Sequence, residues 1–515
     1  MTPPAPPAPR RAGRAPPNVV VIMADQLKAT ASSVYGAGGT ATPALERLAE
    51  RGVTYRNAFT PSPLCVPARV SLWSGRYPSS HGSRLNETPM PEGVAHAFRL
   101  WREAGYATAL IGKNHCFEEP TDLALFDVLC EIGHEGLPPD RPPRGMEWYR
   151  PTAAVEAAHA TRRAMPRQAP AVSYAVTDHP LDDYSTGLVT GQAVRYLESR
   201  AATDGPFALW VSYPDPHTPY EAPRSYFEAA ARDGIVLPET EPPDMPGAPE
   251  RTRVLRRLLD VASAPERERR RLLATYRAMI RFVDDGVGRI LAAIEGAGLD
   301  GDTIVVFLAD HGDFALEHGM ARKGGAFYDC LTRVPLIVSW PGHAPAGVVD
   351  DGMANLVDVV PTLLALQGLA APPGVQGRPL PTLTDAAPRE VVFSEYGAGG
   401  PPFTLADLDD LGERVGTTHG LDAVRASLKL REAEGFRKMV RTRDWKYVHD
   451  ELGDLDELYD LRADPGELTN LAGRMGHAHE VGELGAILTA WTSATDGATG
   501  LARPDRGAGR TDAQA

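Results

Sequence analysis

The sequence predicts an α/β protein with a large, mostly parallel central sheet flanked by helices and a smaller C-terminal antiparallel-sheet subdomain. Two observations predict the main sheet: four apolar runs rich in Val, Ile and Leu, and helical segments that alternate with them. A change of texture after residue 370 predicts the subdomain. We therefore divide the 515-residue chain into a main unit over 18–380 and a subdomain over 381–495, with disordered tails at 1–17 and 496–515.

The four apolar runs do not alternate between apolar and polar residues, as a strand with one wet face would. Uniformly apolar runs are typical of parallel strands that are buried on both faces. The runs cover residues 18–24, 107–111, 207–213 and 303–309. We expect all four to lie in the central sheet.

Two segments have clear helical signals. The first covers 42–51, where Thr42 can cap the helix, Pro43 occupies the first helical position and Gly52 follows the end. The second covers about 266–296 and carries its apolar residues at helical spacing. Helices between strands are typical of crossover connections in a parallel sheet.

The C-terminal part has shorter elements. A Pro- and Gly-rich connector over 371–381 precedes short strand-like pieces, and a helix closes the segment near 481–492. The strand-like pieces cover 391–395, 438–442, 446–449 and 457–461. They predict a small antiparallel sheet.

Composition excludes several classes of protein. Lys and Arg number 53 and Asp and Glu 67, so the net charge is −14, which argues against a nucleic-acid binder. Residues 1–17 contain no apolar signal segment, although Arg10 and Arg11 form a twin arginine, and no run is long enough to span a membrane. Four cysteines form no disulfide framework. We expect a cytoplasmic protein with no membrane or nucleic-acid partner.

Polar groups follow each of the four apolar runs. Because ligands bind beyond the carboxyl ends of the strands in open α/β sheets, these groups are candidates for one shared site. A single such residue would more often be a turn former or a helix cap. In chain order the groups are Asp25 and Gln26, Lys113 and His115, His217, and Asp310 and His311.

The chemistry of these groups predicts a metal and an anion. Asp25, Gln26, Asp310 and His311 offer mostly oxygen ligands and one imidazole, a set that suits a hard divalent cation. We expect Ca²⁺, with Mg²⁺ or Mn²⁺ as alternatives. Further positive charge comes from Arg69, Lys113 and Lys323. A metal and several cations together predict a pocket for a tetrahedral oxyanion.

Cys65-Val66-Pro67-Ala68-Arg69 is followed by Gly75-Arg76, and here the sequence resembles the type I sulfatase family of the alkaline-phosphatase-like superfamily. That family carries a Cys-x-Pro-x-Arg signature, and a maturase oxidises its cysteine to formylglycine. The resemblance runs from the first apolar run to Asn470-Leu471 near the C-terminus. It implies a sulfatase that hydrolyses a sulfate ester through a metal-bound formylglycine made from Cys65.

The resemblance also implies a role for each site residue. Arg69 would hold the hydrated formylglycine, Lys113 the sulfate, and His115 would lie near the nucleophile. His217 and Lys323 would meet the ester oxygen, and Asn86 would contact the substrate. The implied metal ligands are Asp25, Gln26, Cys65, Asp310 and His311.

Two departures from the common sulfatase pattern leave alternatives open. Gln26 and His311 stand where many sulfatases carry Asp and Asn, and both variants are similar to the choline sulfatase and phosphonate monoester hydrolase branches. Lys113 and His115 speak against the phosphonate branch. The alternatives are a phosphonate monoester or phosphodiester hydrolase on the same scaffold and an unmodified anion binder without turnover.

The expected partners are a small sulfate ester and a formylglycine-generating maturase, and relatives of this kind often assemble into homo-oligomers. Three variable stretches could line the substrate pocket. They cover 132–183, 222–265 and 397–430.

Overall fold

The fold is that of a computed structural model, which describes most of the chain. The described residues are 16–36, 38–146, 149, 151–169, 172–200, 204–240, 245, 247–415 and 435–496. The expected tails over 1–17 and 496–515 lie outside this part of the chain, apart from 16–17 and 496. They stay predictions.

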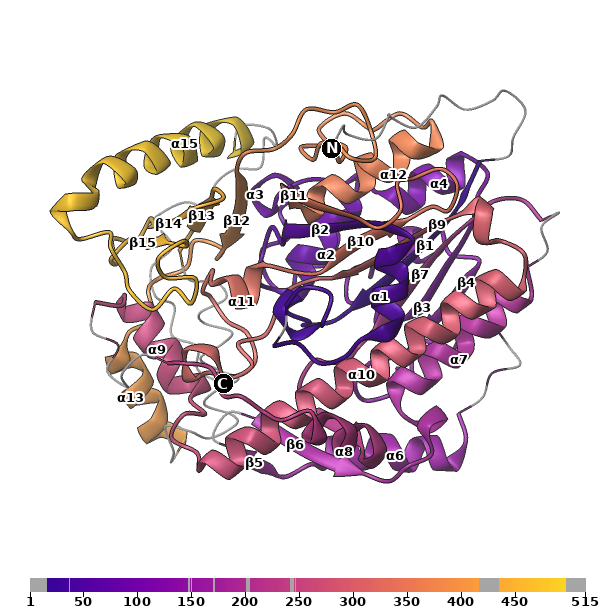
Figure 1. Ribbon diagram of the computed structural model, residues 1–515, viewed down its shortest axis with the longest axis horizontal. Helices are drawn as coiled ribbons and strands as arrows, with labels where there is room; N and C mark the ends of the chain where they lie inside the picture. The colour runs from indigo at the N-terminus through magenta and orange to yellow at the C-terminus, as the bar shows by residue number, and fades with distance from the viewer. Residues whose placement is uncertain are drawn as a thin grey trace.

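An eight-stranded sheet forms the centre of the molecule, in the order β11-β2-β10-β9-β1-β7-β3-β4 (Figure 1). Strand β10 runs antiparallel to both of its neighbours, and the other pairings are parallel. The strands are β1 Asn18–Ala24, β2 Gly52–Phe59, β3 Ala107–Gly112, β4 Val128–Glu131, β7 Phe207–Tyr213, β9 Thr303–Ala309, β10 Leu336–Ser339 and β11 Val348–Asn355. The predicted mostly parallel sheet is confirmed.

The apolar runs lie at the centre of this sheet. Strand β1 pairs with β7 on one side and β9 on the other, so that Val20 lies opposite Leu209 and Val305. Every residue of these three strands is buried. Burial on both faces explains why the runs are apolar throughout instead of alternating.

Helices cover both faces of the sheet (Figure 1). On one face lie α1 (Pro43–Glu50), α7 (Ser185–Glu198) and the long α10 (Glu266–Gly296), whose bounds match the predicted helix. On the other lie α2 (Cys65–Ser74), α4 (Ala97–Glu103) and α12 (Val359–Gln367). Helix α2 is buried along its whole length, which fixes the position of its first residue.

The start of α1 corrects one expectation. Thr42 is the residue before the helix, but its hydroxyl bonds Ser32 and Ser33 and does not cap the helix. The carboxylate of Asp284, on α10, accepts hydrogen bonds from the first free amides, at 3.0 Å from Ala44 N and 2.8 Å from Leu45 N. A cap from another helix cannot be read from local sequence, because the capping rules describe neighbours along the chain.

A separate antiparallel sheet, β12-β13-β14-β15, forms the C-terminal part and confirms the predicted subdomain sheet. Its strands are β12 Val392–Tyr396, β13 Arg437–Arg441, β14 Trp445–Asp450 and β15 Glu457–Asp460, and α15 (Ala478–Asp496) packs on it. Ion pairs that use a buried cation join it to the main unit: Lys446 to Asp329 at 2.7 Å, and Arg251 to Asp450 at 2.8 Å. The boundary at residue 380 stays a prediction.

The predicted insertion over 132–183 contains α6 (Ala153–Arg163) and two strands of a small third sheet. That sheet joins β5 (Arg167–Ala169), β6 (Val172–Thr177) and β8 (Tyr220–Pro223). The remaining helices are α3 Pro78–His81, α5 Pro120–Leu123, α8 Arg224–Arg232, α9 Glu250–Leu259, α11 Asp329–Thr332 and α13 Leu405–Val415.

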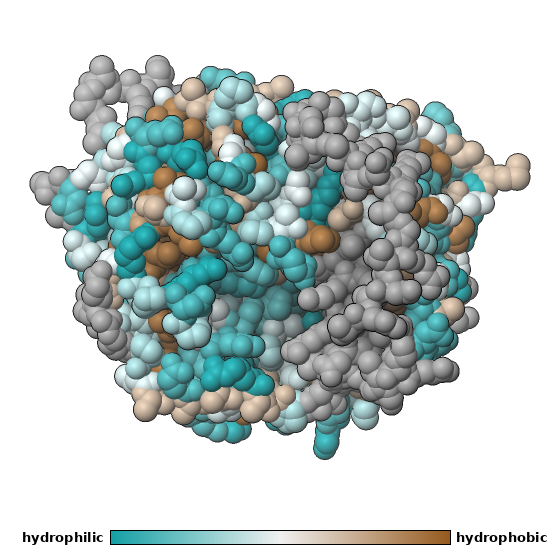
Figure 2. All heavy atoms as spheres, turned by 180° about the vertical axis from the view of Figure 1, so that it is seen from behind, coloured by the Kyte–Doolittle hydropathy of each residue, from teal (hydrophilic) through white to brown (hydrophobic). Residues whose placement is uncertain are grey.

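Hydrophilic side chains dominate the face shown in Figure 2, and hydrophobic residues form small separate patches there. Apart from Leu452 and Leu455, the large hydrophobic residues exposed in the described chain are far apart in sequence, such as Val236 and Met475. Within the described residues, no helix is both long and apolar enough to cross a membrane.

Candidate active site

Two carboxylates at the carboxyl edge of the sheet are held together by one arginine. Asp25 follows β1 and Asp310 follows β9, and both are fully buried. The Arg69 guanidinium, on α2, donates to Asp25 Oδ2 and to Asp310 Oδ2, each at 2.9 Å. It also donates to the Lys113 carbonyl oxygen at 2.8 Å and to Ser212 Oγ at 3.1 Å. Arg69 therefore fixes the ends of four elements, and its expected contact with a modified Cys65 stays a prediction.

Gln26 lies beside Asp25 in the left-handed region, with φ 67°. Its backbone N–H donates to Asp310 Oδ1 at 3.1 Å, and its side-chain amide N–H donates to Asp313. The amide oxygen lies 3.3 Å from Lys323 Nζ. Because Asp313 holds the nitrogen, the amide oxygen is turned toward the site. This role of Asp313, three residues beyond Asp310, was not predicted from the sequence.

Cys65 is the first residue of α2 and is 1% exposed. Its Sγ lies 3.2 Å from His311 Nε2, 2.8 Å from Lys323 Nζ and 3.8 Å from Asp25 Oδ1. A helix N-terminus adds partial positive charge at this point. The fold thus places the thiol among basic side chains, at the edge where the predicted strand-end groups meet.

The charges around Cys65 favour an anion. Burial opposes the thiolate, but Lys323, Lys113 and His311 together hold the pKa of the Cys65 thiol well below its usual value. The effect is mutual: burial acts against the charged Lys323, yet Cys65 and Asp25 raise the pKa of that lysine. The site is therefore built to stabilise negative charge at the position of the Cys65 side chain.

Lys113 and His115 follow β3 and lie in the same cluster. Lys113 Nζ pairs with Asp25, and burial together with Lys113 lowers the pKa of His115, which hydrogen-bonds to Cys65. Gly112 makes this approach feasible. Its φ is 112°, and a Cβ there would lie 2.0 Å from the Ser212 carbonyl oxygen. The absence of a side chain at Gly112 thus lets β3 and β7 meet directly below the site.

His217 comes from the loop after β7. Its Nδ1 donates to the Thr218 carbonyl oxygen at 2.6 Å, and its side chain hydrogen-bonds to Cys65. Burial and the neighbouring Lys323 lower the pKa of His217 to about 3, so that the imidazole is neutral here. His217 and Lys323 thus lie at Cys65 together, and Lys323 carries the proton.

Arg162, on α6, holds this loop and was not predicted from the sequence. It is 2% exposed and donates to Asp215 Oδ1 at 2.7 Å and to the Pro219 carbonyl oxygen at 3.0 Å. A longer contact of 3.4 Å joins it to the His217 carbonyl oxygen. The insertion therefore contributes a structural support to the site as well as a wall.

His134 is a second residue that sequence analysis missed. Its Nε2 lies 3.2 Å from Lys113 Nζ, and its ring centroid lies 4.5 Å from that of His217. The signal existed, because His134 follows β4 and that strand lies next to β3. Strand β4 has four residues, Val-Leu-Cys-Glu, and is too short and polar-ended to stand out as an apolar run.

Asn86 lies close to the start of α2. Its Oδ1 accepts a hydrogen bond from the Val66 N–H at 3.2 Å and so binds a free amide of the helix N-terminus. The structure therefore places Asn86 in contact with Val66, the residue that follows Cys65. Its predicted contact with the substrate stays a prediction.

Four predicted ligands form one compact group. One ligand atom from each of Asp25, Cys65, Asp310 and His311 lies within 4.8 Å of the others, and all four residues are buried. Carboxylate oxygens and an imidazole are donors that a divalent cation accepts, and Gln26 adds an amide oxygen beside them. The residues fit a metal ion, and its identity stays open.

A cavity of about 1100 Å³ opens beside Lys113, His115 and His134. Its outer wall comes from the insertion and includes Leu137 and Tyr149. The predicted insertion therefore does border the site. The part of the third variable stretch over 416–434 lies outside the described residues.

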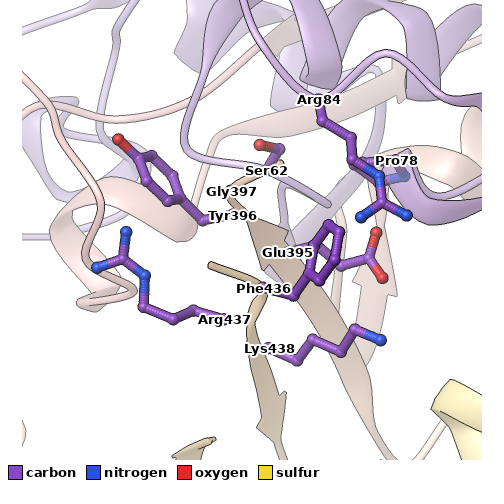
Figure 3. Close-up of a pocket in the computed structure, with 9 residues that line it drawn as sticks. All are labelled: Ser62, Pro78, Arg84, Glu395, Tyr396, Gly397, Phe436, Arg437 and Lys438. Carbon is purple, nitrogen blue, oxygen red and sulfur yellow. The ribbon is translucent and has the colours of Figure 1, made fainter. Parts of the chain in front are cut away.

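A second cavity, near the edge of β12 and β13, is much smaller, with room for about 10 Å³. Figure 3 shows Arg84, Glu395 and Lys438 near one another, with Tyr396 and Arg437 on the other side. Glu395 accepts a hydrogen bond from Ser79 N at 2.6 Å. A space of this size holds about one water molecule, so this is not the substrate site.

Solved structures share this fold over nearly the whole chain. The phosphonate monoester hydrolase SpPMH from Silicibacter pomeroyi has a TM-score of 0.74 at 23% identity, covering 94% of this chain and 97% of its own. The phosphonate monoester hydrolase of Agrobacterium radiobacter has a TM-score of 0.72 at 23% identity, covering 93% and 96%. These likenesses show that the chain shares its fold with phosphonate monoester hydrolases of known structure.

Sequence comparison gives the family. The sulfatase family model matches residues 17–369. The choline-sulfatase of Rhizobium meliloti is 29% identical, over 88% of this chain and 82% of its own. The multifunctional alkaline phosphatase superfamily protein PehA of Trinickia caryophylli is 28% identical, over 92% and 95%. The chain belongs to the sulfatase family, a family of sulfuric ester hydrolases, as the sequence predicted.

We expect Arg162→Met to destabilise the protein and to impair catalysis. The change leaves the buried Asp215 carboxylate without its cation, so the free energy of unfolding should fall by about 3–5 kcal/mol. Hydrolysis of an aryl sulfate should fall as well, because the His217 loop loses its support. Urea denaturation and steady-state kinetics measure the two effects.

The control is Arg267→Met, on α10, where the side chain is 91% exposed and pairs with the neighbouring Glu268. It should change stability by no more than about 0.5 kcal/mol. Equal effects of the two substitutions would contradict the assigned role of Arg162.

Proposed function

We propose that this protein hydrolyses a sulfate ester to an alcohol and inorganic sulfate through a formylglycine made from Cys65. One observation carries the proposal. The Cys65 side chain lies at the N-terminus of a buried helix and contacts both His311 and Lys323. A nucleophile at this position lies between the candidate metal ligands and the lysine side chains that we propose bind the sulfuryl group.

A divalent metal ion fits the group formed by Asp25, Gln26, Cys65, Asp310 and His311. When bound, the ion would lower the pKa of a coordinated hydroxyl group and offset charge on the reacting oxygens. Ca²⁺ is the first candidate because the donors are mostly oxygen atoms, and Mg²⁺ and Mn²⁺ are the alternatives. Arg69 keeps two of the ligands in place by contacting both carboxylates.

The chemistry starts from hydrated formylglycine, which carries two hydroxyl groups. One of them, deprotonated because the bound metal would lower its pKa, would form a bond to sulfur as the bond from sulfur to the ester oxygen breaks, and the alcohol would leave once its oxygen is protonated. Lys113 and Lys323 offset charge on the sulfuryl oxygens. The second hydroxyl would then give its proton to His115, the proposed base, and sulfate would be expelled as the aldehyde re-forms.

The leaving oxygen needs a proton when the alcohol is a weak acid. His217 and Lys323 are the two groups proposed for that oxygen. Lys323 is protonated in this structure, whereas His217 is neutral and donates its Nδ1 hydrogen to Thr218. Lys323 therefore supplies the proton directly. His217 can supply it once the negative charge of the substrate has raised its pKa.

Phosphonate monoester or phosphodiester hydrolysis is the second candidate. It is favoured by Gln26 and His311 in the ligand group, and the SpPMH structure shares the fold. Lys113 and His115 favour the sulfatase instead, because together they place a cation and an imidazole next to Cys65. The relatives include a choline-sulfatase and an ulvan-active sulfatase, whose names indicate different substrates. We therefore propose no single leaving alcohol for this chain.

The maturase would have to reach Cys65 before the chain folds. The residue is 1% exposed, and all ten residues of its helix are buried. An oxidising enzyme cannot contact that side chain in the folded state. We therefore propose that modification precedes folding and that folded, unmodified protein stays unmodified.

We expect the purified protein to hydrolyse 4-nitrophenyl sulfate with a higher kcat/KM than a matched phenylphosphonate ester. Cys65→Ser should lower steady-state turnover by about 1000-fold or more, because a serine ester cannot expel sulfate by forming an aldehyde. Mass spectrometry of Cys65→Ser should show a trapped sulfo-serine.

The matched control is Cys130→Ala, which removes another buried thiol. It should keep most of the activity. Full turnover by Cys65→Ser would exclude the formylglycine route, and a preference for the phosphonate ester would favour the second candidate.

We expect dialysis against a chelator to remove activity and lower thermal stability. A metal ion at about 100 times its Kd stabilises the folded protein by about 2.7 kcal/mol, so adding Ca²⁺ should raise the Tm again. Titration of Mg²⁺ and Mn²⁺ would rank the ions. Asp310→Asn should reduce the shift in Tm, since it removes a charged ligand. Equal stability and activity with and without the chelator would rule out a required metal.

A further inference from the structure

His134 lies at the same edge of the sheet as the proposed catalytic groups. It follows β4, the neighbour of β3, which carries Lys113 and His115. Gly133 and Gly136 form a tight turn around it, with Gly133 N donating to the Gly136 carbonyl oxygen at 2.8 Å. This turn presents the imidazole toward Lys113.

Two contacts define the position of the ring. His134 Nε2 lies 3.2 Å from Lys113 Nζ. On its face, the His134 ring packs against the His217 ring, with centroids 4.5 Å apart and an angle of 31° between the planes. His134 therefore contacts one residue proposed for the sulfuryl oxygens and one proposed for the ester oxygen.

The contact with Lys113 fixes the tautomer. An ammonium group only donates hydrogen bonds, so His134 Nε2 must accept and the ring proton must be on Nδ1. Burial, together with Lys113 and His217, lowers the pKa of His134, which agrees with a neutral ring. A neutral acceptor orients the ammonium without removing its charge.

Lys113 needs this orientation because its side chain is long and flexible. Its ammonium group has three N–H bonds. One points to Asp25 and one to His134, which leaves a third for a substrate oxygen. Without His134, Asp25 alone would direct the group, and an ammonium on a four-carbon chain would sample other positions.

Helices α6 and α7 hold the turn in place. Ser185 Oγ donates to the Gly133 carbonyl oxygen at 2.9 Å, and His159, on α6, lies 3.2 Å from that hydroxyl. Arg163 donates to the Glu135 carbonyl oxygen at 2.7 Å. The turn around His134 is thus fixed from both sides, as a positioning element must be.

We propose that His134 is a positioning residue that directs Lys113 through its Nε2 atom and supports His217 through ring packing. The inference rests on the proposed function, because it assigns Lys113 and His217 to the reacting group. It adds a residue of the insertion to the machinery of the site.

Three substitutions test the proposal. His134→Gln places an amide near the Nε2 position and can still accept from Lys113, whereas His134→Asn reaches only the Nδ1 position, and His134→Ala has neither. We expect kcat/KM on 4-nitrophenyl sulfate to fall by about 10- to 100-fold in His134→Ala and His134→Asn. His134→Gln should stay within about threefold of the unsubstituted protein. His479→Ala, at an exposed position of α15, is the control and should leave activity unchanged.

Binding of inorganic sulfate, measured by calorimetry, gives a readout that needs no turnover. His134→Ala and His134→Asn should weaken it by about the same factor as kcat/KM, and His134→Gln should restore it. Equal loss in His134→Gln and His134→Ala, or full activity in His134→Ala, would overturn the proposal. Failure of the unsubstituted protein to hydrolyse sulfate or phosphonate esters would instead refute the proposed function, and sulfate binding by the variants would still decide the role of His134.

Discussion

The site depends on the buried guanidinium of Arg69. Two carboxylates, Asp25 and Asp310, end neighbouring strands at the centre of the sheet, and their charges would repel each other without a cation between them. Arg69 donates to both and also to carbonyl oxygen atoms at the end of β3. Because breaking one partner from a buried ion pair costs about 3–5 kcal/mol, the arrangement of the strand ends is tied to the fold itself.

The ion pairs of Arg69 also explain how an acidic protein can contain a binding site for an anion. The net charge is −14, yet the groups around Cys65 are mainly basic. The positive charge of Arg69 is balanced by the two carboxylates. Lys113 and Lys323 are therefore the cations that we assign to the reacting group. Positive charge is thus local, on side chains fixed by neighbouring strands. In a buried site such fixed charges act more strongly than they would in water.

Much of this arrangement can be predicted from the sequence. Strands β1, β7 and β9 are uniformly apolar because neighbours cover both faces, so their bounds match the predicted runs. The strand-end rule then brings Asp25 and Asp310 together. Strand β11 was missed because it lies at the sheet edge and its apolar residues are interrupted by Asp350, Asp351 and Gly352, with only its last three residues buried.

Contacts between distant segments account for the other omissions. Arg162 acts on a loop more than fifty residues further along the chain, and Asp284 caps a helix that comes long before it. No local pattern marks either residue, because their partners are set by packing of whole helices. His134 is intermediate: its position at a strand end is readable, but only once the short strand β4 is recognised.

The state of Cys65 tests the central claim most directly. The protein should be isolated from its native host, digested and analysed by mass spectrometry for the peptide that contains Cys65. The proposed function predicts the mass of an aldehyde, or of its hydrate, in place of the thiol. An unmodified thiol in all of the protein would contradict it, and the chain would then be an anion-binding member of the sulfatase family without the proposed catalytic roles.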